Sequence, residues 1–172
     1  QTLALVACGS AHAEQWGVAG RALDFHDLKG DVEALIAQGG EPQRWRFDAQ
    51  HLPGWLHPGR AASILCDEVV VGHIGAVHPR LASALDLADD VHVAELALPN
   101  LQKRRLPQAQ PVPRLPSLRR DIAVDLPESV NWAQVQACVR ASLGERLRDL
   151  QLFDLYQGQG VDQGRKSFAM GL

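Results

Sequence analysis

Residues 121–144 read DIAVDLPESVNWAQVQACVRASLG, which is the most regular stretch of this 172-residue chain. Apolar side chains alternate with polar or small ones over residues 121–126, and such alternation is typical of a half-buried strand. The side chains expected on its buried side are Ile122, Val124 and Leu126. The apolar face of such a strand must pack against another element, and the residues that follow can form one.

An amphipathic helix is predicted over residues 132–143, because its apolar side chains recur at helical spacing. The apolar stripe consists of Trp132, Val135, Val139 and Leu143. Either Ser129 or Asn131 can accept hydrogen bonds from the first free N–H groups, and Gly144 suits a left-handed exit. The helix is therefore expected to lie on the strand and to end at residue 143.

Two further strands are predicted, over residues 150–156 and 165–172. The glycines of residues 158–164 join two strands, where a dinucleotide-binding loop needs a strand followed by a helix, so a hairpin loop is predicted. The side chains expected to face inward are Phe153, Leu155, Phe168, Met170 and Leu172. The order strand, helix, strand, strand is that of the first two-thirds of a ferredoxin-like fold, whose second helix and fourth strand are expected after Leu172.

One face of this sheet is expected to be an open platform, because both helices of a ferredoxin-like fold cover the opposite face. The side chains predicted on the open face are Ala123, Asp154, Tyr156 and Ser167. An aromatic ring can stack an unpaired RNA base, and a carboxylate or hydroxyl can hydrogen-bond to the edge of the base. The small alanine leaves room for the base, so the pattern predicts a site for single-stranded RNA.

Basic residues flank these strands and are candidates for phosphate contacts. They are Arg119, Arg120, Arg165 and Lys166. The alternative for Arg119 and Arg120 is an ordinary ion pair with Asp121 or Asp125. The whole chain has 17 Lys+Arg against 20 Asp+Glu, a net charge of -3, which excludes binding of nucleic acid by bulk electrostatics but not through a local site.

The N-terminal part is predicted to be α+β with an antiparallel sheet, because its strands follow one another as hairpins. The expected elements are a buried strand at 2–8, a helix at 27–38 capped by Asp27, a hairpin of 62–66 and 69–77, a short helix from Pro79 and a strand at 91–98. Residues 99–118 hold five of the ten prolines, which disfavours both helix and central strand, so this segment is predicted to be a linker.

Neither covalent catalysis nor metal binding has a good candidate. Three cysteines far apart argue against a disulfide framework or a zinc site and favour a reducing cytosol. His57, His73 and His78 lack the spacing and the carboxylate companion of a metal site, and no serine lies in a nucleophile elbow.

No apolar run has the length of a membrane span, and the first residues lack the pattern of a signal peptide. We therefore expect a cytoplasmic protein with no catalytic and no metal-binding residue in this chain.

Five strings of sequence carry a resemblance to a known family. They are DFHDLKGDVEALI (24–36), HPGRAASI (57–64), VGHIGAVHPRL (71–81), LPSLRRDIAV (115–124) and LFDLYQGQGVDQGRKSFAMGL (152–172). In this order and separation they resemble the beta chain of bacterial phenylalanine–tRNA ligase. The resemblance implies a fragment from the C-terminal part of that chain, without its N-terminal modules and without the last helix and strand of its anticodon-binding domain.

The same resemblance implies three segments. They are a non-catalytic module at 1–100 with the fold of a class II aminoacyl-tRNA synthetase, a Pro-rich linker at 101–114, and a ferredoxin-fold anticodon-binding domain at 115–172. In this family the alpha chain carries the adenylate chemistry, which uses ATP and magnesium, and an alpha2beta2 heterotetramer attaches phenylalanine to tRNA(Phe). The implied partners are therefore the alpha subunit and tRNA(Phe), with no membrane and no DNA, and the fragment alone is expected to hold no cofactor and to be inactive.

The resemblance also bears on the predicted platform. Family positions that match Ala123, Asp154, Tyr156 and Ser167 lie around the first anticodon base, a guanine. Two other functions stay open: an assembly scaffold without RNA contact, which large apolar patches on residues 1–100 favour, and a ligand-sensing module, which a closed pocket at the sheet favours. An open platform that carries Tyr156 and Asp154 favours RNA.

Overall fold

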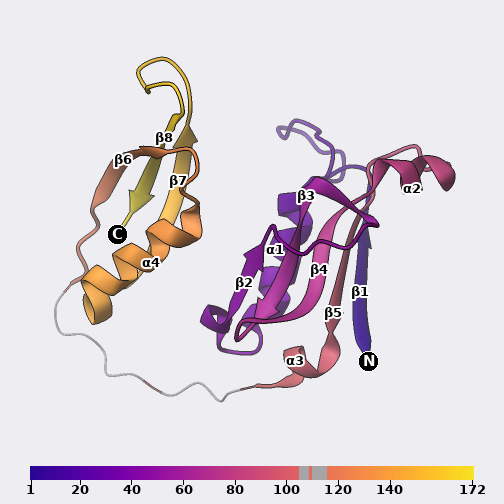
Figure 1. The fold of residues 1–172 in the computed structure, drawn as a ribbon, viewed down its shortest axis with the longest axis horizontal. Coiled ribbons are helices and arrows are strands. Elements are labelled where there is room, and N and C mark those ends of the chain that lie inside the picture. Colours follow the sequence, from indigo (N-terminus) through magenta and orange to yellow (C-terminus); the bar gives the residue numbers. More distant parts are fainter. Residues whose placement is uncertain (105–108, 110–115) are drawn as a thin grey trace. The chain divides into compact units, whose positions relative to one another are not determined.

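The structure is a computed structural model that describes residues 1–104, 109 and 116–172 (Figure 1). The chain divides into two compact units, Gln1–Ala109 and Gln110–Leu172, and each is described by itself. Half of the predicted linker of residues 99–118 lies outside the described residues. Its expected start at residue 99 is wrong, because Leu98–Gln102 forms the short helix α3. Pro99 stands in the first turn of α3, where a helix does not use the missing N–H group.

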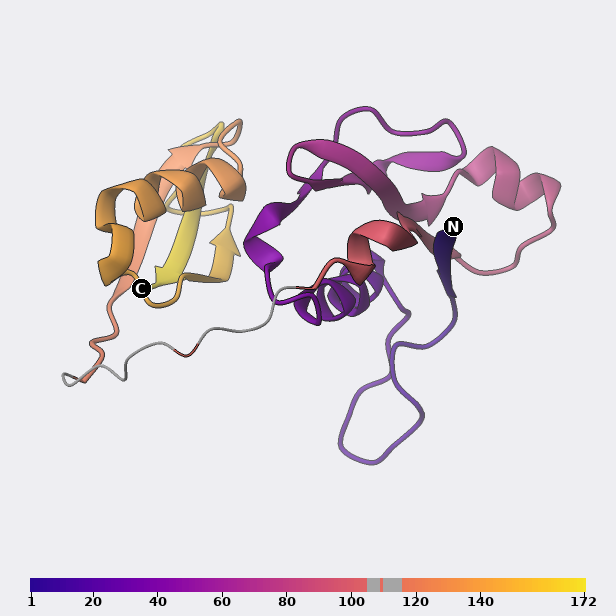
Figure 2. The same cartoon turned by 90° about the horizontal axis from the view of Figure 1, so that it is seen from below.

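The first unit is a five-stranded antiparallel sheet in the order β1-β5-β4-β3-β2, so the predicted antiparallel architecture is confirmed. Its strands are β1 Thr2–Ala7, β2 Trp45–Asp48, β3 Leu56–Cys66, β4 Val69–Val77 and β5 His92–Ala97. Its helices are α1 Phe25–Ala37, the 3-10 turn Pro42–Arg44, α2 Pro79–Ala84 and α3. Helix α1 lies across one face of the sheet (Figure 2).

The core of the first unit lies between α1 and this face of the sheet. Leu28, Val32 and Ile36 of α1 are buried there. They pack with Ala62, Ile64, Ile74, Ala94 and Leu96 of the central strands. No helix of the described residues is long and apolar enough to cross a membrane.

Helix α1 begins earlier than predicted. Asp24, not Asp27, is the N-cap, and its side chain accepts hydrogen bonds from the N–H groups of His26 and Asp27. The Asp27 carboxylate returns a bond from the Asp24 N–H, which completes a capping box. Two hydrogen bonds of 2.6 Å from the Arg21 guanidinium hold the pKa of Asp27 well below its usual range.

Strand β1 is an edge strand and not the buried strand that its apolar sequence suggests. It pairs with β5 alone among the described strands, and every second side chain is exposed. Val6 is 68% exposed. An apolar run that is expected in a central strand can equally lie at an edge, because periodicity does not report the number of neighbours.

The predicted hairpin of β3 and β4 is confirmed, and its two turn residues both have positive φ, 49° at Asp67 and 65° at Glu68. Non-glycine residues seldom adopt this conformation, although two-residue hairpins require it. Arg44 pairs with Asp67, and Arg46 of β2 pairs with Glu68 at 2.6 Å. The sequence analysis did not predict strand β2. Arg46 of this strand and Arg44 just before it thus stabilise the turn through ion pairs.

The second unit has the element order that was predicted: β6 Asp121–Pro127, α4 Trp132–Leu143, the 3-10 turn Gly144–Arg146, β7 Gln151–Tyr156 and β8 Arg165–Gly171. Its sheet order is β6-β8-β7, and both pairings are antiparallel. Of the two possible caps, Asn131 is the one used, in a capping box with Gln134. The residue at the C-cap, Gly144, has φ 52°.

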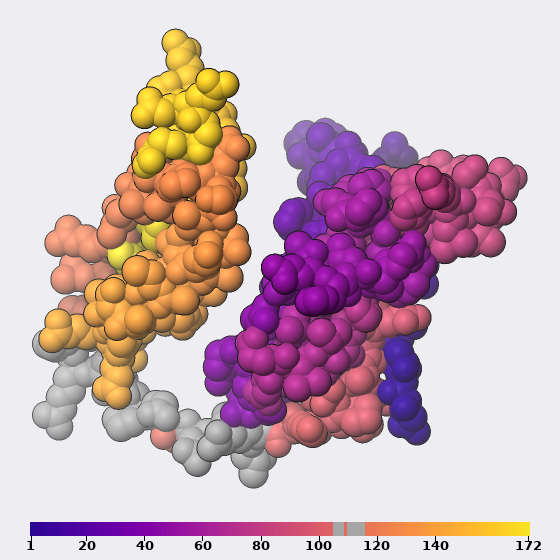
Figure 3. Space-filling model, in the orientation of Figure 1, coloured from indigo at the N-terminus to yellow at the C-terminus, as the bar shows by residue number. Residues whose placement is uncertain are grey.

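The core of this unit lies between the sheet and α4. Phe168 and Met170 of β8 are each 2% exposed, and Trp132 meets Phe168 edge-on with ring centroids 6.0 Å apart. In Figure 3 the side chains of α4, in orange, cover much of the sheet behind them. The face toward α4 is therefore the covered face.

A β-bulge in β7 overturns one part of the prediction. Leu152 lies opposite Met170 and Asp154 lies opposite Ala169, so Phe153 is an extra residue. Leu152 packs against the core, whereas Phe153, expected to be buried, is 50% exposed. Leu155, also expected to be buried, lies opposite Phe168 on this edge strand and is 52% exposed. The extra residue shifts the alternation by one, which brings Leu152 to the covered face and keeps Asp154 on the other.

Candidate nucleic-acid interface

The open face of the second unit brings the four predicted site residues together. Cross-strand pairing places Ala123 and Asp154 on either side of Ala169, and Asp125 and Tyr156 on either side of Ser167. We call these six residues the platform. Directly opposed residues share a face of a sheet, and the neighbours of Ala169 and Ser167 along β8, Phe168 and Met170, face α4. The platform therefore lies on the face away from α4.

Two members of the platform, Asp125 and Ala169, were not among the predicted site residues. Both have the same alternation in their strands as the predicted ones. Only the pairing of β8 between β6 and β7 shows that they complete two rows of three residues. At about 4.8 Å between neighbouring strands, each row is about 10 Å wide.

Tyr156 is 45% exposed, and its hydroxyl donates a hydrogen bond of 3.0 Å to the carbonyl oxygen of Gln159. The hydroxyl lies close to Gly158, where an added Cβ would stand 2.9 Å from it. The glycine therefore lets the hairpin loop hold the ring at the end of β7. The loop of residues 158–164 is a hairpin loop, as predicted, because it joins the antiparallel neighbours β7 and β8.

Asp154 and Ser167 offer polar groups beside this ring. Asp154 is exposed, and its carboxylate makes no hydrogen bond or ion pair within the described part of the chain. The Ser167 hydroxyl is partly buried and has no such partner there either. Both side chains are therefore free to bind a ligand on the open face.

The four basic candidates have different surroundings. Arg119 Nε donates to Asp121 Oδ1 at 3.0 Å, so the alternative of an ordinary ion pair is what the structure shows for it. Arg165 pairs with Asp125 at 2.9 Å, beside the platform. Lys166 lies on the covered side, where its ammonium donates to the Glu128 carbonyl at 2.8 Å and stands 5.0 Å from the Phe168 ring centroid.

Arg120 differs from the other three. Its backbone pairs with Leu172 through hydrogen bonds of 3.0 and 2.8 Å, and its guanidinium has no ion pair with any described residue. It lines a groove of about 1360 Å³ at the end of this sheet. Other basic residues of the groove are Arg119, Arg146 and Arg148, with Glu145 and Asp149 among them.

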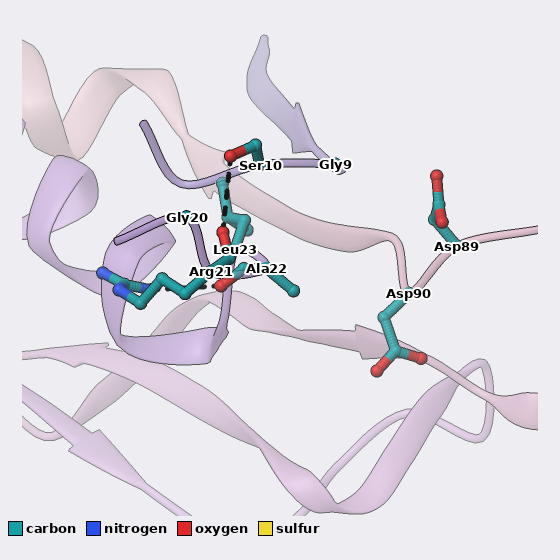
Figure 4. Close-up of a pocket in the computed structure, with 8 residues that line it drawn as sticks. All are labelled: Gly9, Ser10, Gly20, Arg21, Ala22, Leu23, Asp89 and Asp90. Atoms are coloured by element: carbon teal, nitrogen blue, oxygen red, sulfur yellow. Dashed lines mark hydrogen bonds between the residues drawn. The ribbon is translucent and has the colours of Figure 1, made fainter. Parts of the chain in front are cut away.

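A second hollow, of about 430 Å³, belongs to the first unit (Figure 4). Ser10 bonds the backbone oxygen of Arg21, and the Arg21 guanidinium extends away from Asp89 and Asp90. Arg21 is paired with Asp27, and Asp90 with Arg60 at 2.6 Å. Arg21 and Asp90 of this hollow are thus held in ion pairs within the first unit.

The histidines also have local roles. The Nδ1 atoms of His57 and His78 accept backbone N–H bonds from Gly59 and Arg80 at 3.0 and 3.1 Å. Burial lowers the pKa of the His92 imidazole, which is 2% exposed. Within residues 1–104, 109 and 116–172, no three His, Cys, Asp or Glu side chains are grouped so that they could hold a metal ion.

Comparison with known proteins identifies the family. Residues 1–98 match the family described as the phenylalanyl tRNA synthetase beta chain CLM domain, and residues 113–172 match the ferredoxin-fold anticodon binding domain. Among relatives, the phenylalanine–tRNA ligase beta subunit of Xanthomonas campestris pv. campestris (strain 8004) is 51% identical over 172 residues. That of Xylella fastidiosa (strain Temecula1) is 45% identical over 170 residues.

These alignments cover 100% and 99% of this chain but 21% of each relative, so the chain spans about a fifth of their length. The relatives are named as ligases, and the matches confirm the resemblance drawn from the five strings. This chain belongs to the beta-subunit family of phenylalanine–tRNA ligase, an aminoacyl-tRNA synthetase.

Proposed function

We propose that the second unit binds the anticodon of tRNA(Phe) through its platform, as part of a complete ligase that attaches phenylalanine to this tRNA. One observation carries the proposal: the open face presents a half-exposed Tyr156 in one row and an unpaired Asp154 in the neighbouring row. The residues of β8 beside them, Ser167 and Ala169, are small and leave this face open. An open sheet face with an aromatic ring is a common platform for single-stranded RNA. A ligand-sensing module would instead enclose its ligand.

In this proposal the four predicted residues divide the work. The Tyr156 ring stacks the first anticodon base. Guanine presents N1–H and an exocyclic amino group, and the Asp154 carboxylate, which accepts hydrogen bonds only, is matched to these donors. Ser167 supplies a further polar contact. A larger side chain at Ala123 would crowd the row that contains Asp154.

Phosphate contacts complete the proposed interface. Arg120 has no ion pair among the described residues, and it can bind a phosphate without giving up a carboxylate. Arg165 has a carboxylate partner beside the platform, which a phosphate would replace, whereas Arg119 is paired with Asp121 outside the platform and is expected to contribute less. Lys166 lies on the covered side, so its contribution is the weakest of the four.

The first unit is proposed to be the synthetase-like module that packs on the alpha subunit, within an alpha2beta2 heterotetramer in the cytoplasm. An antiparallel sheet with a helix across one face is compatible with the class II synthetase fold. The proposed segments are 1–100 for this module, 101–114 for the linker and 115–172 for the anticodon-binding domain.

ATP and magnesium serve the complete enzyme in this proposal. The described residues do not fit a magnesium ion, because no three His, Cys, Asp or Glu side chains among them are grouped closely enough to hold one, and Asp67 and Asp125 are paired with Arg44 and Arg165. The proposal therefore assigns both groups to other parts of the ligase and no step of adenylate formation to this chain.

Replacing Tyr156 with alanine in the complete two-subunit ligase tests the proposal. Loss of a stacking ring costs about 1–3 kcal/mol per base, so kcat/KM for tRNA(Phe) should fall roughly 5- to 150-fold. The measurement is aminoacylation kinetics at varied tRNA concentration. Unchanged kcat/KM for tRNA would contradict the platform and favour a scaffold without RNA contact.

Two comparisons make this result specific. Tyr156→Phe keeps the ring and loses only the bond to Gln159, so it should have a milder effect. Phenylalanine-dependent pyrophosphate exchange does not use tRNA and should stay near its normal rate in both variants. An equal fall in pyrophosphate exchange would point to damaged folding.

Asp154→Ala should weaken the choice of guanine at the first anticodon position. A base-edge contact of this kind is worth about 1–3 kcal/mol of discrimination, by analogy with other nucleic-acid complexes. The measurement compares kcat/KM for the normal transcript with that for transcripts substituted at this base. A preference for guanine as strong as that of the unmodified enzyme would remove Asp154 from the proposed contact.

A further inference from the structure

One row of the platform ends in an ion pair between two strands. Arg165 Nε donates to Asp125 Oδ2 at 2.9 Å, and a terminal nitrogen of the same guanidinium donates to the Asp125 carbonyl oxygen at 2.8 Å. Asp125 stands directly opposite Ser167, which stands opposite Tyr156. The guanidinium is therefore attached to the row that contains the proposed stacking ring.

The pair is exposed enough to exchange its partner. The side chains of Arg165 and Asp125 are 37% and 47% exposed. A guanidinium has five N–H donors, and the two bonds to Asp125 use two of them. An exposed ion pair contributes little to stability, so a phosphate group can displace the carboxylate at small cost.

We infer that Asp125 is a positioning residue that occupies Arg165 in the free protein and restrains its attraction for RNA phosphate. This inference rests on the proposed anticodon site. With the carboxylate in place, Arg165 is held beside the row of Tyr156 and its charge is balanced. Binding of RNA at the platform then exchanges the Asp125 carboxylate for a phosphate, and the bond to the Asp125 carbonyl keeps the guanidinium in position.

The chain offers a matched control on the same strand. Arg119 pairs with Asp121 at 3.0 Å, and Asp121 lies opposite Gly171. Asp121 precedes Asp125 by four residues on β6, about 13 Å along the strand, so it lies outside the two rows of the platform. Asp121→Asn and Asp125→Asn make the same change in charge, each beside one arginine.

The experiment measures tRNA(Phe) binding to the complete ligase over a series of salt concentrations. Asp125→Asn should raise the affinity about two- to fivefold, the range expected for an exposed ion pair. It should also steepen the slope of log affinity against log salt by about 0.7, because no carboxylate then offsets the charge with which Arg165 neutralises the phosphate. Asp121→Asn should give a smaller gain, and adding Arg165→Gln to Asp125→Asn should remove the gain.

The outcomes separate this inference from the proposed function. If Tyr156→Ala lowers binding while Asp125→Asn leaves affinity and slope unchanged, the inference is overturned and the platform stands. A loss of affinity in Asp125→Asn also overturns it, because the carboxylate would then assist binding. If Tyr156→Ala has no effect, the proposed function itself fails.

Discussion

Phe168→Ala is expected to destabilise the second unit by about 3–5 kcal/mol, the usual cost of removing a buried phenylalanine. Phe168 is 2% exposed, lies on the central strand β8 and contacts the Trp132 ring of α4. In a small domain this loss is comparable with the total free energy of unfolding. The platform should be lost with it, because β8 carries Ser167 and Ala169.

Hydrogen exchange of the 172-residue chain, resolved by peptide, measures this effect within one molecule. Peptides from β6 and β8 should lose protection, while peptides from β3 and β4 of the first unit should keep it. Phe153→Ala is the matched control, because this side chain is 50% exposed and should cost much less. Equal losses from the two substitutions would refute the assignment of Phe168 to the core.

Gly72→Ala is expected to destabilise the first unit by about 3 kcal/mol or more. A Cβ at this position would stand 2.1 Å from the backbone oxygen of Glu95 and 3.0 Å from Leu96 Cα. Both atoms belong to the backbone of β5, which no side-chain rotation can move away. Overpacking against flexible side chains commonly costs about 1–3 kcal/mol, and a backbone clash lies at or above this range.

The control for this prediction is Gly30→Ala in α1, where a Cβ meets nothing within 4 Å. Alanine is favoured over glycine in a helix by about 0.5–1 kcal/mol, so this variant should be more stable. Urea unfolding of both variants, followed through peptides of β4 and β5, gives the comparison. If Gly72→Ala unfolds at the same urea concentration as the unmodified chain, β4 and β5 do not pair as described.

Much of the second unit could be predicted because its signals are local. The bounds of α4, the cap at Asn131 and the exit at Gly144 depend on residues within one or two turns of each other. The alternation of β6 and β8 likewise needs only neighbouring residues. The same reasoning failed for Phe153, because a bulge forms between two strands and leaves no mark on the alternation of one.

In the first unit, the positions of two strands depend on pairing between residues far apart in the sequence more than on local sequence signals. Strand β2 has four residues, too few for a clear period, and it forms because Trp45 and Phe47 pack against the core beside β3. Strand β1 has an apolar sequence and yet lies at an edge. Neither position can be derived from composition or spacing.

The candidate site likewise has features that the sequence predicts and features that only the structure shows. The amino-acid sequence by itself determined the face of Ala123, Asp154, Tyr156 and Ser167, although it misassigned Leu152 and Phe153 of the same sheet. Only the tertiary structure decided that Ala169 and Asp125 complete their rows, and that Arg165 faces Asp125 while Lys166 lies against Phe168. The physical reason is that side-chain direction alternates along a single strand, whereas the choice of partner depends on which strands pair and in which register.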